Sequence, residues 1–268
     1  MQNDSYNRIV NILDKIIANK RCEFEANIAK KSLATIRAEA EKVPHTRKPF
    51  RALFAAGNVL IAEVKPKSPS VGTLIEASPL ETAEIYAESS ADAISVLTDE
   101  KYFGGSLELL EKVSKIVPQP LLRKDFIIDA YQVYETALTN ASAFLLIAAV
   151  LSADEMRSFR ELGKRFGLDT ITEIHTAEEL LKALESGADL IGINNRNLQT
   201  LDIDLVMTET LAPGIPASVP FVSESGIENA EDVRRVRGIG ARGILVGTSI
   251  LRSQDPLAAI RALKLALS

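Results

Sequence analysis

A short pattern recurs four times along this chain, and it limits the possible folds more than any other feature of the sequence. Each copy has a small residue, an alanine, one variable residue and then an apolar run. The copies are SADAISVL from Ser90, NASAFLLI from Asn140, GADLIGIN from Gly187 and GARGILVG from Gly240. Their alanines lie about 50 residues apart, the length of two strand–helix units. Because small residues end helices and apolar runs form strands, the repeat predicts an α/β architecture.

Four more short apolar runs lie before, between or after these copies: VLIAEV from Val59, PLLRKD from Pro120, TITEIH from Thr170 and VPFVSE from Val219. Together they make eight strand candidates. Six segments between or after them are predicted to be helices, namely SPLETAEIYAESS, SLELLEKVSKIV, SADEMRSFRELGKRF, TAEELLKALESG, NAEDVRRVRGIG and DPLAAIRALKLAL, with candidate N-caps at Ser78, Ser106, Ser152 and Thr176. Alternating strands and helices predict a mainly parallel sheet. Eight units in about 210 residues favour a closed (β/α)₈ TIM barrel, with a doubly wound Rossmann-like sheet as the alternative.

About 55 residues precede the first strand. Residues 7–20, NRIVNILDKIIANK, have the apolar spacing of an amphipathic helix. A second helix is predicted from about Glu23 to Val43, where Ala, Lys and Glu are frequent. No Ser/Gly-rich linker separates this region from the rest. We therefore expect a single domain over 1–268, in which an N-terminal helical extension (1–55) packs on the barrel (56–268).

Composition restricts the partners. The chain has 268 residues and a net charge of −5, so no global positive field attracts nucleic acid or an anionic membrane. The single cysteine, Cys22, suits a reducing compartment. The N-terminus lacks the features of a signal peptide. The longest apolar stretch, Ala143 to Leu151, is about half the length needed to span a bilayer. We expect a cytoplasmic protein with no nucleic-acid or membrane partner.

Charged residues follow several of the apolar runs, at the point where each predicted strand ends. Glu63 and Lys65 are two residues apart, so both project to the same face. Lys124 and Glu173 end two other strands. Because barrel strands present their carboxyl ends at one rim, we expect two lysines and two carboxylates in one pocket. Their mutual fields predict lysines with pKa values lowered toward neutrality as proton donors and a carboxylate as acceptor. A structural ion pair is the alternative for Glu63 and Lys65.

The last two strands are followed by small residues that lead into helices. Ser225-Gly226-Ile227 and Gly247-Thr248-Ser249 leave backbone N–H groups able to point at an anion. In many barrels these two loops hold a phosphate, and residues 68–72 are placed to close over it. His45 and His175 are the only histidines, and they form no metal-ligand spacing with the single cysteine. A phosphorylated small molecule is the expected ligand, and no metal is expected.

The chain resembles the indole-3-glycerol phosphate synthase family from about Arg51 to Leu251, and its N-terminal helices are similar to the family's extension. The matching motifs are IAEVKPKSPSVG, SVLTDEKYFGGSLE, LLRKDFIIDAYQVYE, LLIAAVL, TEIHTAEEL, IGINNRNL, SESGI and LVGTSIL. The resemblance implies conversion of 1-(2-carboxyphenylamino)-1-deoxyribulose 5-phosphate to indole-3-glycerol phosphate, a lyase step of tryptophan biosynthesis that releases CO₂ and water. It implies no metal and no organic cofactor.

The same resemblance implies roles for individual residues. Lys124 in RKDF resembles the general acid that protonates the ketone oxygen, and Glu173 in TEIH resembles the general base. Glu63 and Lys65 in AEVK resemble a dyad that assists ring closure, decarboxylation and dehydration. Asn194 in INNR is grouped with these catalytic residues. The division of proton transfers between Lys65 and Lys124 stays open.

For substrate binding, the resemblance implies polar contacts, a phosphate site and an aromatic-ring pocket. The residues are Ser68, Phe103, Leu146, Arg196, Ser225, Gly226, Gly247, Thr248 and Ser249, of which Phe103 and Leu146 are expected to line the ring pocket. We expect a monomer or weak homo-oligomer. The alternatives are another phosphate-binding barrel enzyme, such as a phosphoribosylanthranilate isomerase or a Schiff-base aldolase, or a non-catalytic barrel that binds a phosphometabolite.

Overall fold

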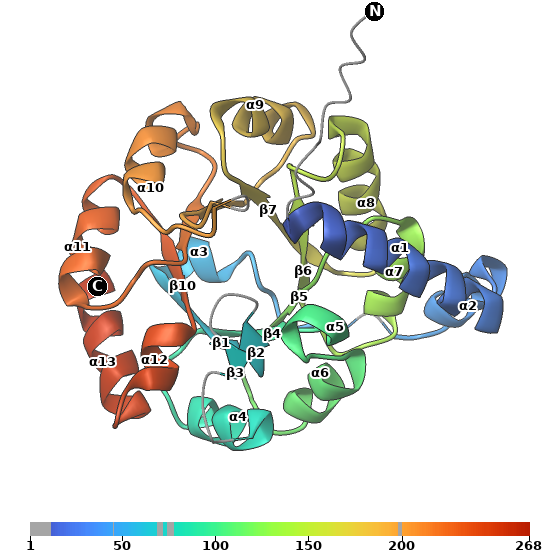
Figure 1. Cartoon of the computed structure of the whole chain (residues 1–268), viewed down its shortest axis with the longest axis horizontal. Coiled ribbons are helices and arrows are strands. Elements are labelled where there is room, and N and C mark those ends of the chain that lie inside the picture. The colour runs from blue at the N-terminus through green and yellow to red at the C-terminus, as the bar shows by residue number, and fades with distance from the viewer. Residues whose placement is uncertain (1–11, 45, 69–71, 74–77, 198–199) are drawn as a thin grey trace, which may run out of the picture.

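Eight parallel strands close into a barrel in the computed structural model, which describes residues 12–44, 46–68, 72–73, 78–197 and 200–268 (Figure 1). Around the barrel the strands pair in the order β1-β10-β9-β8-β7-β6-β5-β4, and β4 pairs with β1. The strands are β1 (Val59–Val64), β4 (Ala93–Leu97), β5 (Leu121–Lys124), β6 (Ala143–Ile147), β7 (Asp169–Ile174), β8 (Ile191–Asn194), β9 (Phe221–Glu224) and β10 (Gly243–Val246). All eight coincide with predicted strands. The barrel prediction is confirmed, and the open Rossmann-like alternative is wrong because β1 pairs with β10.

Helices surround the barrel on its outer face (Figure 1). They are α4 (Pro79–Ala87), α6 (Leu107–Ser114), α7 (Ala130–Ala137), α8 (Ala153–Arg165), α9 (Ala177–Glu185), α10 (Val206–Leu211), α11 (Ala230–Gly238) and α13 (Pro256–Leu267). The four predicted N-caps are confirmed, since each side chain accepts a hydrogen bond from the backbone N–H three residues later. The sequence patterns did not predict α7 and α10. Helix α7 has eight residues, six of them buried, and α10 has only six residues, so each gives a short pattern.

Shorter elements complete the description. They are α3 (Leu53–Ala56), α5 (Glu100–Phe103), the 3₁₀ helix η1 (Ala212–Gly214), α12 (Thr248–Arg252) and the antiparallel hairpin of β2 (Lys67–Ser68) and β3 (Gly72–Thr73). The hairpin and α12 follow β1 and β10 directly, so they lie at the carboxyl ends of the strands. None of the helices in the described part of the chain combines the length and apolarity needed to cross a bilayer.

Successive residues of each strand face the barrel interior and the helices in turn. In β6, Ala143, Leu145 and Ile147 belong to the interior core, whereas Phe144 and Leu146 pack in the layer between strands and helices. The alternation follows from the two-residue period of a strand. It decides which side chains of the strand ends can reach a central cavity.

The N-terminal extension contains α1 (Ile12–Lys30) and α2 (Leu33–Ala40). The prediction that one helix ends before Glu23 and a second begins there is wrong. Helix α1 continues through that position to Lys30, and the next helix begins after Ser32. The hydroxyl of Ser32 accepts from the Thr35 N–H and caps α2. In Figure 1, α1 (blue) lies across the end of the barrel near β5 and β6, and α2 contacts α7. The extension therefore covers part of the rim where the strand ends meet.

Candidate active site

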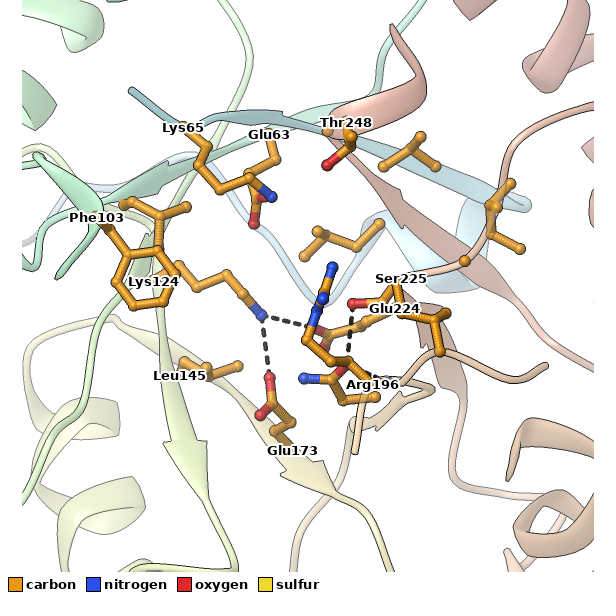
Figure 2. A pocket seen from close by; sticks show the side chains of 18 of the residues that line it. Glu63, Lys65, Phe103, Lys124, Leu145, Glu173, Arg196, Glu224, Ser225 and Thr248 are labelled. Atoms are coloured by element: carbon orange, nitrogen blue, oxygen red, sulfur yellow. Dashed lines mark hydrogen bonds and ion pairs between the residues drawn. The ribbon is translucent and has the colours of Figure 1, made fainter. Parts of the chain in front are cut away.

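A cavity of about 600 Å³ opens at the carboxyl ends of the barrel strands. Figure 2 shows side chains from opposite sides of the barrel converging on it. Twelve of the predicted site residues line the cavity: Glu63, Lys65, Phe103, Lys124, Glu173, Asn194, Arg196, Ser225, Gly226, Gly247, Thr248 and Ser249. Of the remaining two, the side chain of Ser68 lies outside the described residues, as do residues 69–71 of the predicted phosphate lid. Leu146 is discussed below.

Five charged side chains form what we call the mouth cluster: Glu63, Lys65, Lys124, Glu173 and Glu224. The Lys65 Nζ lies 2.5 Å from Glu63 Oε1. The Lys124 Nζ lies 3.0 Å from Glu173 Oε2 and 2.5 Å from Glu224 Oε2, as the dashed lines in Figure 2 mark. The structure thus brings together lysines and carboxylates from four different strands or strand ends, as the rim argument predicted.

The electrostatics of Lys124 correct one sequence-based prediction. Burial alone lowers the pKa of its ammonium group, but the nearby carboxylates of Glu224, Glu173 and Glu63 raise it by more. The net pKa is raised, not lowered toward neutrality. The sequence argument counted a second lysine and did not count Glu224. Lys124 is therefore a cation held between two carboxyl groups, and it donates hydrogen bonds to both.

Glu224 is a site residue that our sequence reasoning left out of the catalytic set. It ends β9 as Lys124 ends β5, so the same rule could have found it. Its Oε1 is buried and has no hydrogen-bond partner in the part of the chain that the structure describes. That oxygen fills space left by Gly192, where any Cβ would meet it at 2.1 Å. Burial, and then Glu173 and Glu63, raise the pKa of Glu224 to about 7 despite the attraction of Lys124.

Glu173 behaves in the opposite way. Burial raises its pKa, but Lys124, His175 and a hydrogen bond from Asn194 lower it by more, so the net pKa is lowered. Asn194 is itself oriented, because its Oδ1 accepts from Ser225 Oγ at 2.9 Å. That contact leaves the amide N–H group of Asn194 for Glu173. The site therefore contains one carboxyl that ionises readily and another, Glu224, that does so only near pH 7.

The two loops predicted to hold phosphate lie together. The Ser249 hydroxyl donates to the Ile227 carbonyl at 2.8 Å, which links the loop after β9 to α12 after β10. Ser225 and Gly226 both have positive φ, 65° and 83°, a conformation that glycine adopts without the steric cost of a Cβ. In Figure 2, Ser225 lies on the side of the cavity away from Phe103. The cavity thus has a polar end and an aromatic end.

The apolar wall of the cavity differs from the predicted one at Leu146. This side chain packs between β6 and the helices, and Leu145 lines the cavity in its place. Both positions are apolar, so sequence could not tell the two faces of the strand apart. Phe103 lines the cavity beside Phe126, with ring centroids 6.1 Å apart. This wall is suited to a planar ring.

Helix α1 supplies a part of the wall that sequence reasoning did not assign to the site. Ile12, Leu13 and Ile16 line the cavity. The amphipathic spacing of these residues predicted that one face of the helix is buried, but it did not show which surface that face packs against. Arg196 reaches the cavity from the loop after β8, with its backbone N–H on Asn194 Oδ1 and its Nη1 on the Leu201 carbonyl. Burial lowers the pKa of its guanidinium by more than the carboxylate of Glu63 raises it.

The described residues contain no group of three His, Cys, Asp or Glu side chains placed to hold a metal ion. What the cavity does contain is a set of proton donors and acceptors of differing pKa next to a polar pair of loops. A closed (β/α)₈ barrel with such a rim defines the chain as a TIM-barrel acid–base enzyme.

Comparison with known proteins gives the family. A family model described as indole-3-glycerol phosphate synthase matches residues 13–263. The indole-3-glycerol phosphate synthase of Lacticaseibacillus casei is 40% identical over 256 residues, covering 94% of this chain and 98% of the relative. That of Albidiferax ferrireducens is 43% identical over 253 residues, covering 92% and 96%. The chain belongs to the indole-3-glycerol phosphate synthase family, and it is a decarboxylating lyase of tryptophan biosynthesis.

A solved structure of N-(5'-phosphoribosyl)anthranilate isomerase from Pyrococcus furiosus also resembles the chain, with a TM-score of 0.56 and 16% identity. The alignment covers 78% of this chain and 98% of the isomerase. At this identity the likeness shows the shared barrel fold alone. It therefore gives no support to the isomerase alternative.

Proposed function

We propose that this cavity converts 1-(2-carboxyphenylamino)-1-deoxyribulose 5-phosphate to indole-3-glycerol phosphate, with the mouth cluster moving the protons. The observation that carries the proposal is Lys124, a cation held between two carboxylates of opposite pKa shift at the centre of a cavity with one polar and one aromatic end. The substrate has matching parts: a phosphate, a ketone and a carboxylated aromatic ring.

Binding follows from the two ends of the cavity. The phosphate lies at the loops of Gly226 and of Gly247 to Ser249, which line the cavity and offer backbone N–H groups to an anion. The aromatic ring packs against Phe103 and Leu145. Lys65 or Arg196 pairs with the carboxylate on the substrate's aromatic ring, since both side chains line the cavity. Holding the substrate at both ends brings the ring carbon and the ketone carbon together, which lowers the entropic part of the barrier.

Ring closure requires an acid at the ketone oxygen. The Lys124 ammonium donates a hydrogen bond there and transfers its proton as the aromatic carbon attacks the carbonyl carbon. Loss of CO₂ from the ring carbon that formed the new bond then restores aromaticity without moving a proton. Glu173 and Glu224 raise the pKa of Lys124 and so hold its proton. Substrate binding must therefore turn the Lys124 Nζ away from these carboxylates before the proton can leave.

Dehydration completes the indole. The new hydroxyl leaves as water after receiving a second proton, from Lys124 or Lys65, and Glu173 accepts the proton lost from the neighbouring carbon. Two protons are delivered and one is removed, so each turnover takes up one proton net. Glu224 is placed to return a proton to Lys124, because its pKa of about 7 lets it exchange with water at neutral pH. Glu63 holds Lys65 in the cavity.

The direct test is to incubate the protein with the carboxyphenylamino-deoxyribulose phosphate and follow indole fluorescence. We expect the signal to rise, and we expect EDTA to leave the rate unchanged. Borohydride added during turnover should not attach substrate to Lys124; such an adduct would favour the aldolase alternative. A folded protein that gives no fluorescence would contradict the proposal. The cytoplasmic location and the monomeric or weakly associated state stay predictions, the former supported by the single cysteine.

A further inference from the structure

His175 is a buried titratable residue next to the site, and the mechanism above gives it no role. It follows β7 two residues after Glu173, and its side chain is 9% exposed. Its Nε2 lies 3.4 Å from Glu173 Oε1. No atom in the described part of the chain completes a hydrogen bond of good geometry with that nitrogen. The contact with Glu173 is therefore the interaction available to the buried edge of the ring.

The other edge of the imidazole is fixed by Glu179. Thr176 caps α9 and accepts from the Glu179 N–H, which turns the Glu179 side chain back toward the helix start. Its Oε2 accepts from the His175 backbone N–H at 2.7 Å and lies 3.2 Å from His175 Nδ1. One carboxylate thus sets both the backbone and the ring of His175. The three residues form a line from α9 to the cavity, which we call the Glu179–His175–Glu173 line.

The charges around the ring decide its protonation state. Glu173 faces it from its own strand, Glu179 from α9 and Glu224 from β9, while Lys124 from β5 holds the far oxygen of Glu173. A neutral ring with its proton on Nδ1 would turn the Nε2 lone pair toward the Glu173 carboxylate. An imidazolium donates at both edges. Burial lowers the pKa of His175, but the three carboxylates raise it by more.

We propose that His175, as an imidazolium anchored by Glu179, is a positioning residue that holds the Glu173 carboxylate while Lys124 is engaged with the substrate. This rests on the proposed function, in which Glu173 is the base. In the structure, Lys124 and His175 take one oxygen each of Glu173. When Lys124 turns to the ketone oxygen, His175 is the cation that stays in place. The base then keeps its orientation for proton removal.

The test compares His175→Gln and Glu179→Gln with the wild type in kcat and KM from pH 6 to 10. We expect His175→Gln to lower kcat about 10-fold with little change in KM, less than the ~10²–10⁴-fold loss expected from removing the base itself. We expect Glu179→Gln to shift the alkaline limb of kcat to lower pH, because the imidazolium loses an anion that stabilises it. A shift confined to KM, or a kcat profile unchanged in both variants, would overturn the proposal.

The matched control is Glu155→Gln. Glu155 accepts from the Ser152 N–H at 2.8 Å at the start of α8, and Glu179 accepts from the His175 N–H just before the N-cap of α9, but within the described residues Glu155 has no hydrogen bond to an imidazole. This variant should lose the same capping energy, seen as a lower Tm, and keep the wild-type pH profile. If the pH profile of kcat in Glu155→Gln shifted as in Glu179→Gln, the shift would come from the loss of a helix cap, and the proposal would be wrong.

A measurement without turnover keeps the proposal separate from the proposed function. The chain has two histidines, so NMR of imidazole-labelled protein gives two titrations, assigned with His45→Gln. We expect the His175 signal to titrate above pH 6.5 in the wild type and at lower pH in Glu179→Gln. Titration at or below the ordinary value in the wild type would overturn the inference even if the enzyme is active. If the wild type were inactive but its His175 signal titrated above pH 6.5, the result would instead refute the proposed function.

Discussion

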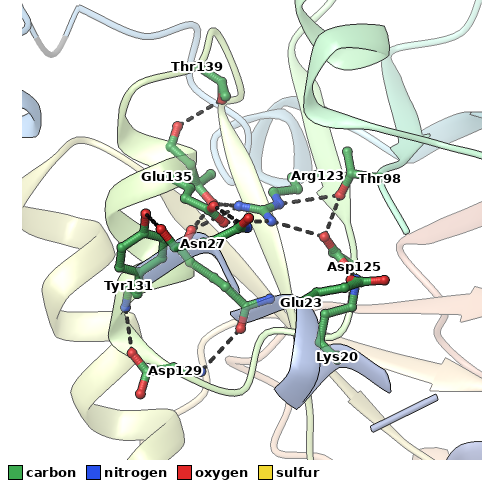
Figure 3. A network of polar contacts seen from close by, with 12 residues as sticks. Lys20, Glu23, Asn27, Thr98, Arg123, Asp125, Asp129, Tyr131, Glu135 and Thr139 are labelled. Carbon is green, nitrogen blue, oxygen red and sulfur yellow. Dashed lines mark hydrogen bonds and ion pairs between the residues drawn. The ribbon is translucent and has the colours of Figure 1, made fainter. Parts of the chain in front are cut away.

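Two buried clusters of charge lie on opposite faces of β5, and they differ in how their charges are matched. Lys124 points into the cavity with the mouth cluster. Arg123 points outward beside Asp125, which also contacts Lys20 (Figure 3). Together with Asp99, these three residues form a set that we call the Lys20 network. Lys20 Nζ lies 2.9 Å from Asp99 Oδ2 and 3.0 Å from Asp125 Oδ1. Arg123 Nη2 lies 2.9 Å from Asp125 Oδ2.

In the Lys20 network Asp125 contacts both cations, while Glu23 lies 2.8 Å from Lys20 and Glu135 lies 3.4 Å from Arg123. The cations Arg123 and Lys20 hold the pKa of Asp125 well below its usual range although burial raises it. In the mouth cluster three carboxylates share two lysines, and the pKa of Glu224 rises to about 7. Asp125 adjoins two cations and stays ionised through the physiological range, whereas Glu224 shares its one cation, Lys124, with Glu173 and titrates within that range. The first arrangement ties α1 to the barrel, whereas the second stores a proton beside the substrate cavity.

The largest effect that this contrast predicts is on turnover. Lys124→Ala should lower kcat by about 10²–10⁴-fold, because it removes the acid at the ketone oxygen. The variant should still bind a phosphorylated substrate analogue, since the loops after β9 and β10 are untouched. Steady-state kinetics and isothermal titration calorimetry measure the two quantities. Near-normal turnover would remove Lys124 from the mechanism.

On the other face of β5, the expected effect is on stability. Arg123→Met should lower the free energy of unfolding by about 3–5 kcal/mol, because it leaves Asp125 buried with Lys20 as the one remaining cation of the network. The exposed pair Arg37–Glu41, 2.9 Å apart, supplies the control: Arg37→Met should unfold at nearly the same urea concentration as the wild type. Urea unfolding measures both, and kcat of the folded fraction should stay within a few-fold of wild type. A large kcat loss in Arg123→Met would mean that the two faces are not separate.

The surplus carboxylate predicts a pH dependence of stability. Because the folded pKa of Glu224 is raised from 4.5 to about 7, the folded state binds the proton more tightly. Its contribution to stability is present below pH 4.5 and is lost as the pH rises through 7. Glu224→Gln cannot ionise, so relative to wild type it should gain up to about 3 kcal/mol between pH 4.5 and 8. Urea unfolding at both pH values tests this, and parallel curves would contradict the assignment.

The smallest expected effect is on KM, and it concerns the two faces of β6. Leu145→Ala should raise KM by about 10-fold, because it removes apolar contact with the substrate ring. Leu146→Ala should leave KM unchanged and cost about 2–5 kcal/mol of stability through the cavity it creates. The pair differs by one position and not in chemistry, so each variant controls for the other. The reverse pattern would mean that Leu146 faces the ring after all.

The order and type of the barrel elements could be predicted because they depend on local patterns. Apolar runs of four to six residues make buried strands, and a Ser or Thr just before a segment of helical spacing begins a helix. Polar residues at the strand ends could be assigned to one rim because a closed parallel barrel has no other arrangement for them. Glu63, Lys65, Lys124 and Glu173 were found in this way.

The tertiary structure decided everything that depends on which face of a strand is inside and on what lies across the barrel. Leu145 and Leu146 are alike in sequence, and only the register of β6 with its neighbours separates cavity from core. Glu224 becomes a partner of Lys124 through packing against Gly192, a contact between neighbouring strands. The direction of the Lys124 pKa follows from that partner. Electrostatic energies depend on distances between residues far apart in the chain, and those distances exist only after folding.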